Sequence, residues 1–306
     1  MTRMTVGSRG SELALAQTQI VVDRLERAFP HIQVALVKML THGDRNQSLT
    51  IDFAEQDGIF VREIEEALLD RRIDMAIHSL KDVPTQLPEG LALAAVLERE
   101  DPRDVIITRG QKLAELLAGA RIGTSSLRRT IQLARIRPDI ETCSIRGNVD
   151  TRLRKVASGE YDGVILAAAG LLRLGWRDRI TEYFSLEQFL PAVGQAALVI
   201  ETRSDDAGVR SVAGAINHLP TWHSITAERA FLRELGGGCT APIAALAAAT
   251  DGHLRLDGMV ASAKSHRVVR STEEGDDEPA DVIGRRLARR LLSMGAAEFI
   301  AEANSL

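Results

Sequence analysis

The sequence predicts an α/β protein with two domains on mixed, largely parallel sheets, followed by a small α+β domain with an antiparallel sheet. A chain of 306 residues is too long for one compact core. Short apolar runs alternate with amphipathic helical runs through the first two thirds, which favours βα units and parallel strands. From about residue 220 strand-like runs follow one another without helices between them, a pattern typical of an antiparallel sheet.

The first domain is expected to open with a strand, after which Ser11 is the expected N-cap of a long helix and Glu12 lies in its first turn. We expect its strands at 3–8, 32–39, 73–77 and 91–97 and its helices at 11–28 and 60–70. The charged, proline-containing turn EREDPRD at 98–104 is interpreted as a linker.

The βα alternation then restarts and predicts a second domain. Its strands are expected near 104–108, 120–123, 140–145 and 162–166, and its helices near 111–118, 125–136, 148–158 and 167–173. Another strand is expected within 191–203, followed by a helix at 206–217. The last part predicts a helix at 221–235, strands at 243–249, 253–260 and 266–271, and a final helix at 279–302. The acidic stretch STEEGDDEPAD before that helix is interpreted as a solvated loop.

Composition narrows the class of protein. The net charge is -4, so charge does not favour a nucleic-acid partner. No apolar run approaches the roughly 20 residues of a membrane span, and MTRMTVGSRG does not resemble a signal peptide. Two distant cysteines, Cys143 and Cys239, form neither a disulfide framework nor a zinc ligand set, so we expect a cytoplasmic protein without a metal.

Basic residues concentrate in one segment. Residues 121–155 carry nine basic and three acidic side chains, so this stretch is +6 in a chain of net charge -4. The chain has 33 Arg and 5 Lys, and a GC-rich genome explains much of that bias at surface positions. The planar fork of arginine suits carboxylates and phosphates, and the clustering predicts a polyanionic ligand.

Two predicted strand–helix junctions carry these arginines. GTSSLRR at 123–129 places Ser125 or Ser126 at a helix start, where free N–H groups favour an anion. SIRGNVDTRLRK at 144–155 adds Arg146 and Arg152 at the next junction, and ligands of open α/β sheets bind at such strand ends. A capped helix with two surface arginines, Arg128 and Arg129, is the alternative interpretation of the first motif taken alone.

Two further motifs offer chemistry. HSLKDVP at 78–84 places Ser79, Lys81 and Asp82 just past a buried strand, as acid–base groups or as a surface ion pair. LGGGCTAP presents Cys239 on a glycine loop, as a nucleophile or as a small buried side chain. Cys143, inside a predicted strand, is expected to be buried.

Taken together, these motifs resemble the porphobilinogen deaminase family. The resemblance covers nearly the whole chain in the family's order, through GSRGSELALAQ at 7–17, HSLKDVPT at 78–85, EREDPRD at 98–104, GTSSLRR at 123–129, RGNVDTRL at 146–153, PAVGQAAL at 191–198, TAERAFL at 226–232 and the GGGC loop. It implies two periplasmic-binding-protein-like domains, 1–98 with 196–215 and 103–191, a third domain at 220–306 and an active site between the first two.

The resemblance also implies an activity. The family members are transferases, hydroxymethylbilane synthases of porphyrin and heme biosynthesis. They condense four porphobilinogen molecules head-to-tail onto a dipyrromethane cofactor, release ammonia and hydrolyse off a linear tetrapyrrole. Here the cofactor would be held by a thioether to Cys239. Asp82 matches the catalytic acid, and a carboxylate at the pyrrole N–H would stabilise the cationic azafulvene and the attacked ring.

The remaining site residues follow from the matching motifs. The resemblance assigns the cofactor to Ser79, Lys81, Asp82, Thr124, Ser125, Ser126, Arg128, Arg129, Arg146 and Gly147, and the substrate to Arg9, Ser11, Phe60, Arg146, Arg152, Arg173 and Gln195. One segment departs from the family: FAEQDGIF at 53–60 has Phe53 and Asp57 where lysines are expected, so its charge is reversed.

Two other classes of protein remain open from the residues. One is a non-catalytic two-domain binding protein for a small polyanion, which would leave Asp82 and Cys239 without a role. The other is a cysteine hydrolase, but none of the seven histidines has a recognisable motif beside a thiol. The resemblance favours a cytoplasmic monomer acting on porphobilinogen, without nucleic acid or membrane.

Overall fold

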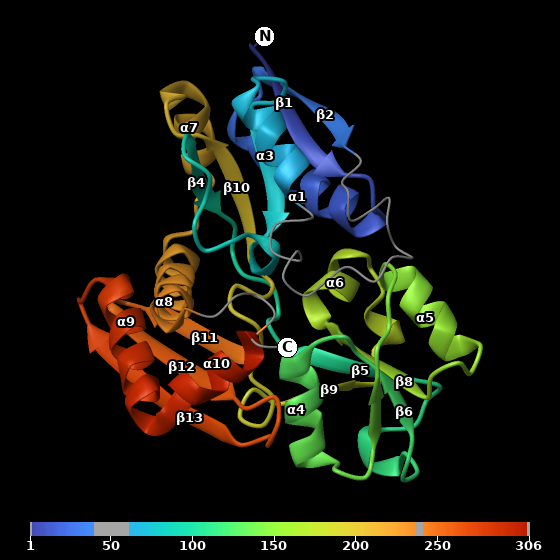
Figure 1. Cartoon of the computed structure of the whole chain (residues 1–306). Helices are drawn as coiled ribbons and strands as arrows, with labels where there is room; N and C mark the ends of the chain where they lie inside the picture. Colours follow the sequence, from blue (N-terminus) through green and yellow to red (C-terminus); the bar gives the residue numbers. More distant parts are fainter. Residues whose placement is uncertain (1, 40–60, 237–240, 305–306) are drawn as a thin grey trace. The chain divides into compact units, whose positions relative to one another are not determined.

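The computed structural model describes residues 2–39, 61–236 and 241–304 (Figure 1). The chain divides into two compact units, Met1–Glu100 with Ala197–His223 and Asp101–Ala196 with Ser224–Leu306. Three sheets account for the strands of the described residues: five-stranded sheets in the first and second units, and a three-stranded sheet in the second.

The sheet of the first unit has the order β2-β1-β3-β10-β4. Its strands are β1 (Thr2–Arg9), β2 (Ile32–Met39), β3 (Met75–Ser79), β4 (Leu91–Val96) and β10 (Leu198–Arg203). β1 pairs in parallel with β2 and β3, whereas β10 is antiparallel to both β3 and β4. The edge at which β1 and β3 end therefore collects two strand–helix junctions and the start of β10.

Helices cover both faces of this sheet. α1 (Glu12–Ala28) and α7 (Ala207–Gly214) pack Leu25 and Val209 on the face that carries Val6 and Ile77. α3 (Arg62–Leu69) packs on the other face, in a core with Ala76 of β3. The alternation of side chains along β3 thus assigns even-numbered residues to the α3 face.

The five-stranded sheet of the second unit repeats the same pattern. Its order is β7-β6-β8-β5-β9, with strands β5 (Asp104–Thr108), β6 (Arg121–Gly123), β7 (Glu141–Cys143), β8 (Gly163–Ala167) and β9 (Glu182–Tyr183). β6 is parallel to β7 and β8, and β5 runs antiparallel between β8 and β9. In each sheet the inserted antiparallel strand is the first one that the chain makes after coming from the other unit.

α4 (Leu127–Ile136) packs on one face of this sheet, through Leu133 against Ile122 and Ile165. α5 (Val149–Ala157) and α6 (Ala168–Arg173) pack on the other, through Val156 and Leu171. All three helices follow directly after parallel strands, so their N-termini lie along one edge of the sheet.

The last part of the chain is an antiparallel meander covered by helices. β11 (Ile243–Thr250), β12 (His253–Ala261) and β13 (Val268–Asp276) pair in chain order. α8 (Leu219–Leu235), α9 (Ala280–Leu291) and α10 (Ala297–Asn304) share one apolar core with them, centred on Phe231 and Leu287. With two mixed sheets and one antiparallel sheet, the predicted fold class is confirmed.

Two expected helices differ in the structure, and one strand was not expected. The expected helix at 111–118 is only a 3-10 turn, Leu113–Glu115, and Arg137 donates to the carbonyl oxygens of Leu113 and Leu116, the first of which would be an acceptor within a helix. The final helix is interrupted at 292–296, where Gly295 has a φ of 101°. β9 was not predicted, because a strand of two residues is too short to show an alternation of apolar and polar side chains.

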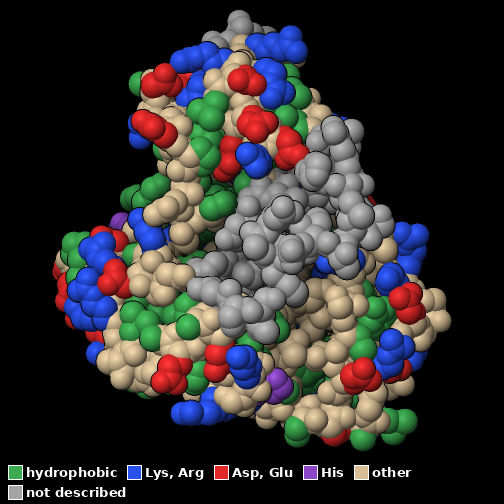
Figure 2. Space-filling model, viewed as in Figure 1, with side chains coloured by type: hydrophobic (Ala, Val, Ile, Leu, Met, Phe, Trp, Pro, Cys, Tyr) green, Lys and Arg blue, Asp and Glu red, His purple; other side chains and the backbone are tan. Residues whose placement is uncertain are grey.

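The acidic stretch at 271–281 is also not a loop, since its first six residues continue β13. Its carboxylates pair with neighbouring arginines: Arg286 Nε lies 2.6 Å from Glu273 Oε1, and Arg255 Nη1 lies 2.7 Å from Glu274 Oε1. Figure 2 shows basic and acidic side chains interspersed where α9 lies in Figure 1. The charges are therefore compensated within the sheet and its covering helix.

Gly284 sets the spacing of α8 and α9, and its substitution should destabilise the protein. A Cβ there would overlap the carbonyl oxygen of Ala227 and lie 2.9 Å from the amide nitrogen of Phe231. We expect Gly284→Ala to lower the free energy of unfolding by about 1–3 kcal/mol, measured by urea denaturation with circular dichroism. Gly214→Ala, a helical site with nothing within 4 Å, is the control; equal effects of the two would contradict the packing argument.

Candidate functional site

The predicted residues of the first unit gather where β1 and β3 end. β1 ends at Arg9, and Ser11 caps α1 by accepting a hydrogen bond from the amide of Ala14 at 3.3 Å. β3 ends at Ser79, whose Oγ lies 3.1 Å from Nε2 of Gln17 on α1. Because β1 and β3 are parallel neighbours, the two junctions lie at one edge of the sheet.

A short 3-10 turn, Leu80–Asp82, follows Ser79. Leu80 is buried, and its amide donates to the carbonyl oxygen of Ala197 at 3.0 Å, which fixes the turn against the start of β10. Lys81 is half-buried and Asp82 is exposed. The sequence thus places an accessible carboxylate on a rigid support, as a positioned acid–base group requires.

The two arginine-bearing junctions of the second unit lie side by side. Ser125, after β6, bonds the loop after β7: its Oγ lies 3.0 Å from Ser144 Oγ, donates to the carbonyl oxygen of Ile145 at 2.8 Å and accepts from its amide at 3.1 Å. Thr124 Oγ1 accepts from the amide of Ser126 at 3.2 Å. Ser126 is the N-cap residue of α4, but its side chain makes no capping bond.

The second junction turns at Gly147. This glycine has a φ of 109°, and a Cβ would lie 2.7 Å from Cγ2 of Thr151. Its carbonyl oxygen accepts from Nε of Arg152 at 2.8 Å, while Arg146 is exposed. Glycine is thus required here by both backbone conformation and space.

Arg128 and Arg129 form a buried ion-pair cluster with Asp104, the first residue of β5. Asp104 is fully buried, and the arginines are 5% and 8% exposed, so their interpretation as surface residues is wrong. Asp104 Oδ2 lies 2.7 Å from Nη1 of Arg128, and Oδ1 lies 2.7 Å from Nη2 of Arg129. Arg128 also donates to the carbonyl oxygen of Leu190 at 2.8 Å.

Gln195 and Arg173 bring the returning segment to the same cluster. Gln195 Nε2 donates to the carbonyl oxygen of Pro102 at 2.8 Å and to Asp104 Oδ1 at 3.1 Å. Arg173, the last residue of α6, donates to the carbonyl oxygen of Ala196 at 2.6 Å. The structure therefore brings Gln195 together with Arg128 and Arg129 around Asp104.

The cluster has more positive than negative charge. Burial alone would raise the pKa of Asp104, but Arg128 and Arg129 outweigh it and lower that pKa to about 2. Burial lowers the pKa of Arg128 more than Asp104 raises it. Burial, and then repulsion from Arg129, lowers the pKa of Arg152 to about 10. Asp104 faces two guanidiniums, and Arg129 also repels that of Arg152, so an anion would relieve the imbalance.

Sequence reasoning missed the role of Asp104, which it placed where the 98–104 linker meets the expected strand at 104–108. The available signal was an acidic residue at the start of the apolar strand DVIIT, because a buried charge needs partners. Cys143 was expected to be buried, yet it is half-exposed because β7 is an edge strand. Cys239, Phe60 and the segment 53–60 with Phe53 and Asp57 lie outside the described residues.

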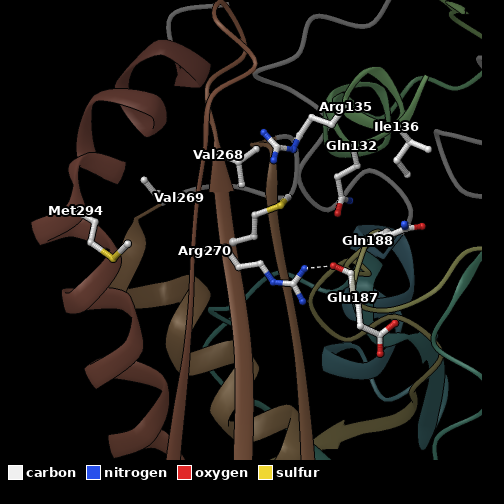
Figure 3. A pocket seen from close by; sticks show the side chains of 10 residues that line it. Gln132, Arg135, Ile136, Glu187, Gln188, Val268, Val269, Arg270 and Met294 are labelled. Atoms are coloured by element: carbon white, nitrogen blue, oxygen red, sulfur yellow. Dashed lines mark hydrogen bonds between the residues drawn. The ribbon is translucent and has the colours of Figure 1, made fainter. Parts of the chain in front are cut away.

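A cavity of about 760 Å³ lies elsewhere in the second unit, among α4, the 187–188 segment, β12 and β13 (Figure 3). Its wall includes Gln132, Arg135, Met259, Arg270 and Met294, none of which is a predicted site residue. Within 2–39, 61–236 and 241–304, no group of three His, Cys, Asp or Glu side chains could hold a metal ion. The described helices are all too short or too polar to cross a membrane.

Comparison with known proteins gives the family. Residues 4–211 match the family described as "Porphobilinogen deaminase, dipyromethane cofactor binding domain", and residues 222–293 match "Porphobilinogen deaminase, C-terminal domain". The chain belongs to the porphobilinogen deaminase family. The porphobilinogen deaminase of Geobacter metallireducens is 47% identical over 98% of this chain and 94% of the relative. That of Thermus thermophilus is 46% identical over 99% of both.

Solved structures also resemble the chain. The methionine binding protein MetQ is 12% identical with a TM-score of 0.45, over 70% of this chain and 89% of MetQ. A nutrient binding protein from Burkholderia cenocepacia bound to methionine is 11% identical with a TM-score of 0.43, over 70% and 91%. The family membership rests on the porphobilinogen deaminase matches, whose cofactor-binding region contains both groups of strand-end residues.

Removing the central acid of the cluster should cost more than removing a surface acid. We expect Asp104→Asn to lower the free energy of unfolding by about 3–5 kcal/mol at neutral pH, because two buried guanidiniums lose their counter-charge. Asp150→Asn, which breaks an exposed pair with Arg154, should cost less than about 1 kcal/mol.

The pH dependence provides a second check on the same pair of variants. The pKa of Asp104 in the folded protein is about 2, below its ordinary 3.8, so its contribution is present above pH 3.8 and lost as the pH falls toward 2. The difference between wild type and Asp104→Asn in urea denaturation should shrink in that window. A constant difference would show that Asp104 does not act as a charged partner.

Proposed function

We propose that in this porphobilinogen deaminase Cys239 carries the dipyrromethane cofactor and Asp82 is the catalytic acid. The enzyme is a hydroxymethylbilane synthase, a transferase of tetrapyrrole and heme biosynthesis. It condenses four porphobilinogen molecules head-to-tail, releases ammonia and hydrolyses off the linear product. When bound, the cofactor supplies the pyrrole to which each new unit is joined.

The excess positive charge around Asp104 is the observation that carries this proposal. Pyrroles of this pathway bear acetate and propionate groups, so cofactor and growing chain are polyanions. Arg128 and Arg129 stand at a helix start and both pair with Asp104, and burial followed by repulsion from Arg129 lowers the pKa of Arg152. A carboxylate there would gain charge-assisted hydrogen bonds, so these residues fit the cofactor.

Asp82 is assigned to the reacting ring. Loss of ammonia from porphobilinogen leaves a cation whose charge is shared with the pyrrole nitrogen. A carboxylate close to that N–H stabilises the cation and can take up or return its proton. Asp82 is exposed, and the buried Leu80 anchors its turn, so it can meet a substrate without reorganising.

The other predicted residues bind and orient. On the first unit, Ser79 and Lys81 are proposed to contact the cofactor, and Arg9 and Ser11 the substrate. On the second, the arginines Arg146, Arg152 and Arg173 are proposed to bind carboxylates. We assign hydrogen bonds to cofactor or substrate to Thr124, Ser125, Ser126, Gly147 and Gln195, and a packing contact with a pyrrole ring to Phe60.

We further propose three domains and a monomeric, cytoplasmic enzyme without a nucleic-acid partner. The first domain would comprise 1–98 and 196–215, the second 103–191 and the third 220–306. Separate apolar cores support the division of the second unit. Two cores lie on the faces of the sheet formed by β5–β9, and a third core lies against the sheet formed by β11–β13. The net charge of -4 argues against nucleic acid.

The covalent attachment can be tested by intact-mass measurement. Protein purified from cells that make porphobilinogen should carry an adduct the size of two pyrrole units. Cys239→Ser should lack the adduct and the activity, whereas Cys143→Ser, the other cysteine of the chain, should keep both. An unmodified wild-type mass would favour the alternative of a non-catalytic binding protein for a small polyanion.

Asp82→Asn should separate cofactor attachment from turnover. We expect the variant to keep the adduct and to lose kcat by about 100- to 1000-fold, because the amide cannot stabilise a cation. Asp70→Asn, at an exposed acid of the same unit that pairs with Arg72, should retain full activity. Normal turnover of Asp82→Asn would refute its catalytic role.

A further inference from the structure

Three titratable side chains with no role in the chemistry above lie buried together on the α3 face of the first sheet. They are Glu65 of α3, His78 of β3 and Glu201 of β10, with exposed fractions of 7%, 5% and 0%. His78 Nε2 lies 3.1 Å from Glu201 Oε2. Within the described residues, Oε1 of Glu65 and Oε1 of Glu201 are buried without a hydrogen-bond partner.

The charges in this cluster do not balance when both acids are ionised. Burial, and then Glu201, raise the pKa of Glu65 to about 7, against opposing effects of His78 and Arg62. Glu66 on the same helix adds a small further increase. Proton binding by the cluster therefore changes close to neutral pH.

Arg203, the next cation on this face of β10, is engaged elsewhere. Its Nη1 donates to the carbonyl oxygens of Leu68 and Ile73, and its Nη2 lies 2.8 Å from Asp206 Oδ2. Arg203 therefore fixes the C-terminal end of β10 to its neighbours. His78 is the hydrogen-bonded partner of Glu201.

The cluster connects the two strands that position the Asp82 turn. His78 directly precedes Ser79, the last residue of β3, and β10 pairs with β3 from Leu198 onward. The carbonyl oxygen of Ala197, just before β10, holds the amide of Leu80. The register of β10 against β4 also shifts between Ile200 and Glu201, an irregularity that redirects side chains and recurs beside active sites.

Stability alone does not account for Glu65. Its pKa in the folded protein exceeds the ordinary 4.5, so the unfolded chain loses its proton first as the pH rises. The fold therefore loses stability between pH 4.5 and about 7, and the loss is complete above that range. Glutamine would fill the same volume without this penalty, and buried acids of this kind concentrate at functional sites.

We propose that Glu65, His78 and Glu201 are positioning residues that hold the end of β3, and with it Lys81 and Asp82, in the reactive geometry. Proton binding within the cluster shifts the alignment of β3 and β10 and so modulates turnover. The inference rests on the proposed role of Asp82. None of the three residues contacts the substrate in this account, because their side chains lie on the face opposite Ser79.

The test is the pH profile of porphobilinogen turnover in matched variants. Wild-type kcat should change through an ionisation at about pH 7, and Glu65→Gln should flatten that change with KM unaltered within about twofold. Glu66→Gln, at an exposed acid one residue along the same helix, should keep the ionisation with only a small downward shift, because Glu66 is the least of the causes that raise the pKa of Glu65. Glu201→Gln should lower kcat by about 10- to 100-fold at constant KM, and Glu201→Asp should restore part of it.

Each result has a defined meaning. A wild-type profile in Glu65→Gln, or a normal kcat in Glu201→Gln, would overturn the positioning role. Glu65→Gln should melt at a higher temperature than wild type at alkaline pH and carry the full adduct mass, so a folding defect in it would also contradict the account. Absence of turnover in the wild type, or full turnover in Asp82→Asn, would instead refute the proposed function.

Discussion

One buried carboxylate, Asp104, holds the strand-end edge of the second unit together. It accepts hydrogen bonds from Arg128 and Arg129 on α4 and from Gln195 on the returning segment. The arginines extend the network to the carbonyl oxygens of Leu190 and Ile165. The start of β5, the start of α4 and the end of β8 are thereby fixed relative to one another. Removing one partner would leave an uncompensated charge in the interior, so the network depends on its charged members.

The two units place buried charge of opposite sign behind their strand ends. In the second unit two guanidiniums face one carboxylate and a third, that of Arg152, is repelled by Arg129, which suits the acetates and propionates that we propose this unit binds. In the first unit two carboxyls face one imidazole, behind the turn that presents Asp82. An enzyme of the porphobilinogen deaminase family must grip a polyanion and stabilise a cation. In the proposed account the arginines of the second unit perform the first task and Asp82 of the first unit performs the second, with the buried carboxyls acting only through the position of its turn.

Much of the fold was predictable because its signals are local. The strand at 32–39 and the helix start at Ser11 followed from periodicity and capping. The failures involve long-range contacts: Arg137 donates to carbonyl oxygens of the expected helix at 111–118, and arginine partners draw the acidic stretch into β13. The motifs supplied the candidate site residues, which stay predictions, but the burial of Arg128 and Arg129 depends on Asp104, more than twenty positions earlier in the sequence. An ion pair between positions so far apart does not alter the local pattern of apolar and polar residues, so the sequence pattern cannot predict it.

The most direct measurement is a crystal structure of the cofactor-bearing enzyme. The account predicts that a cofactor carboxylate oxygen lies within hydrogen-bond distance of the guanidinium of Arg128, Arg129 or Arg152, with Asp104 still paired to both α4 arginines. That arrangement would show the buried excess of positive charge to be the anion site. A cofactor whose carboxylates contact none of these three arginines would contradict it.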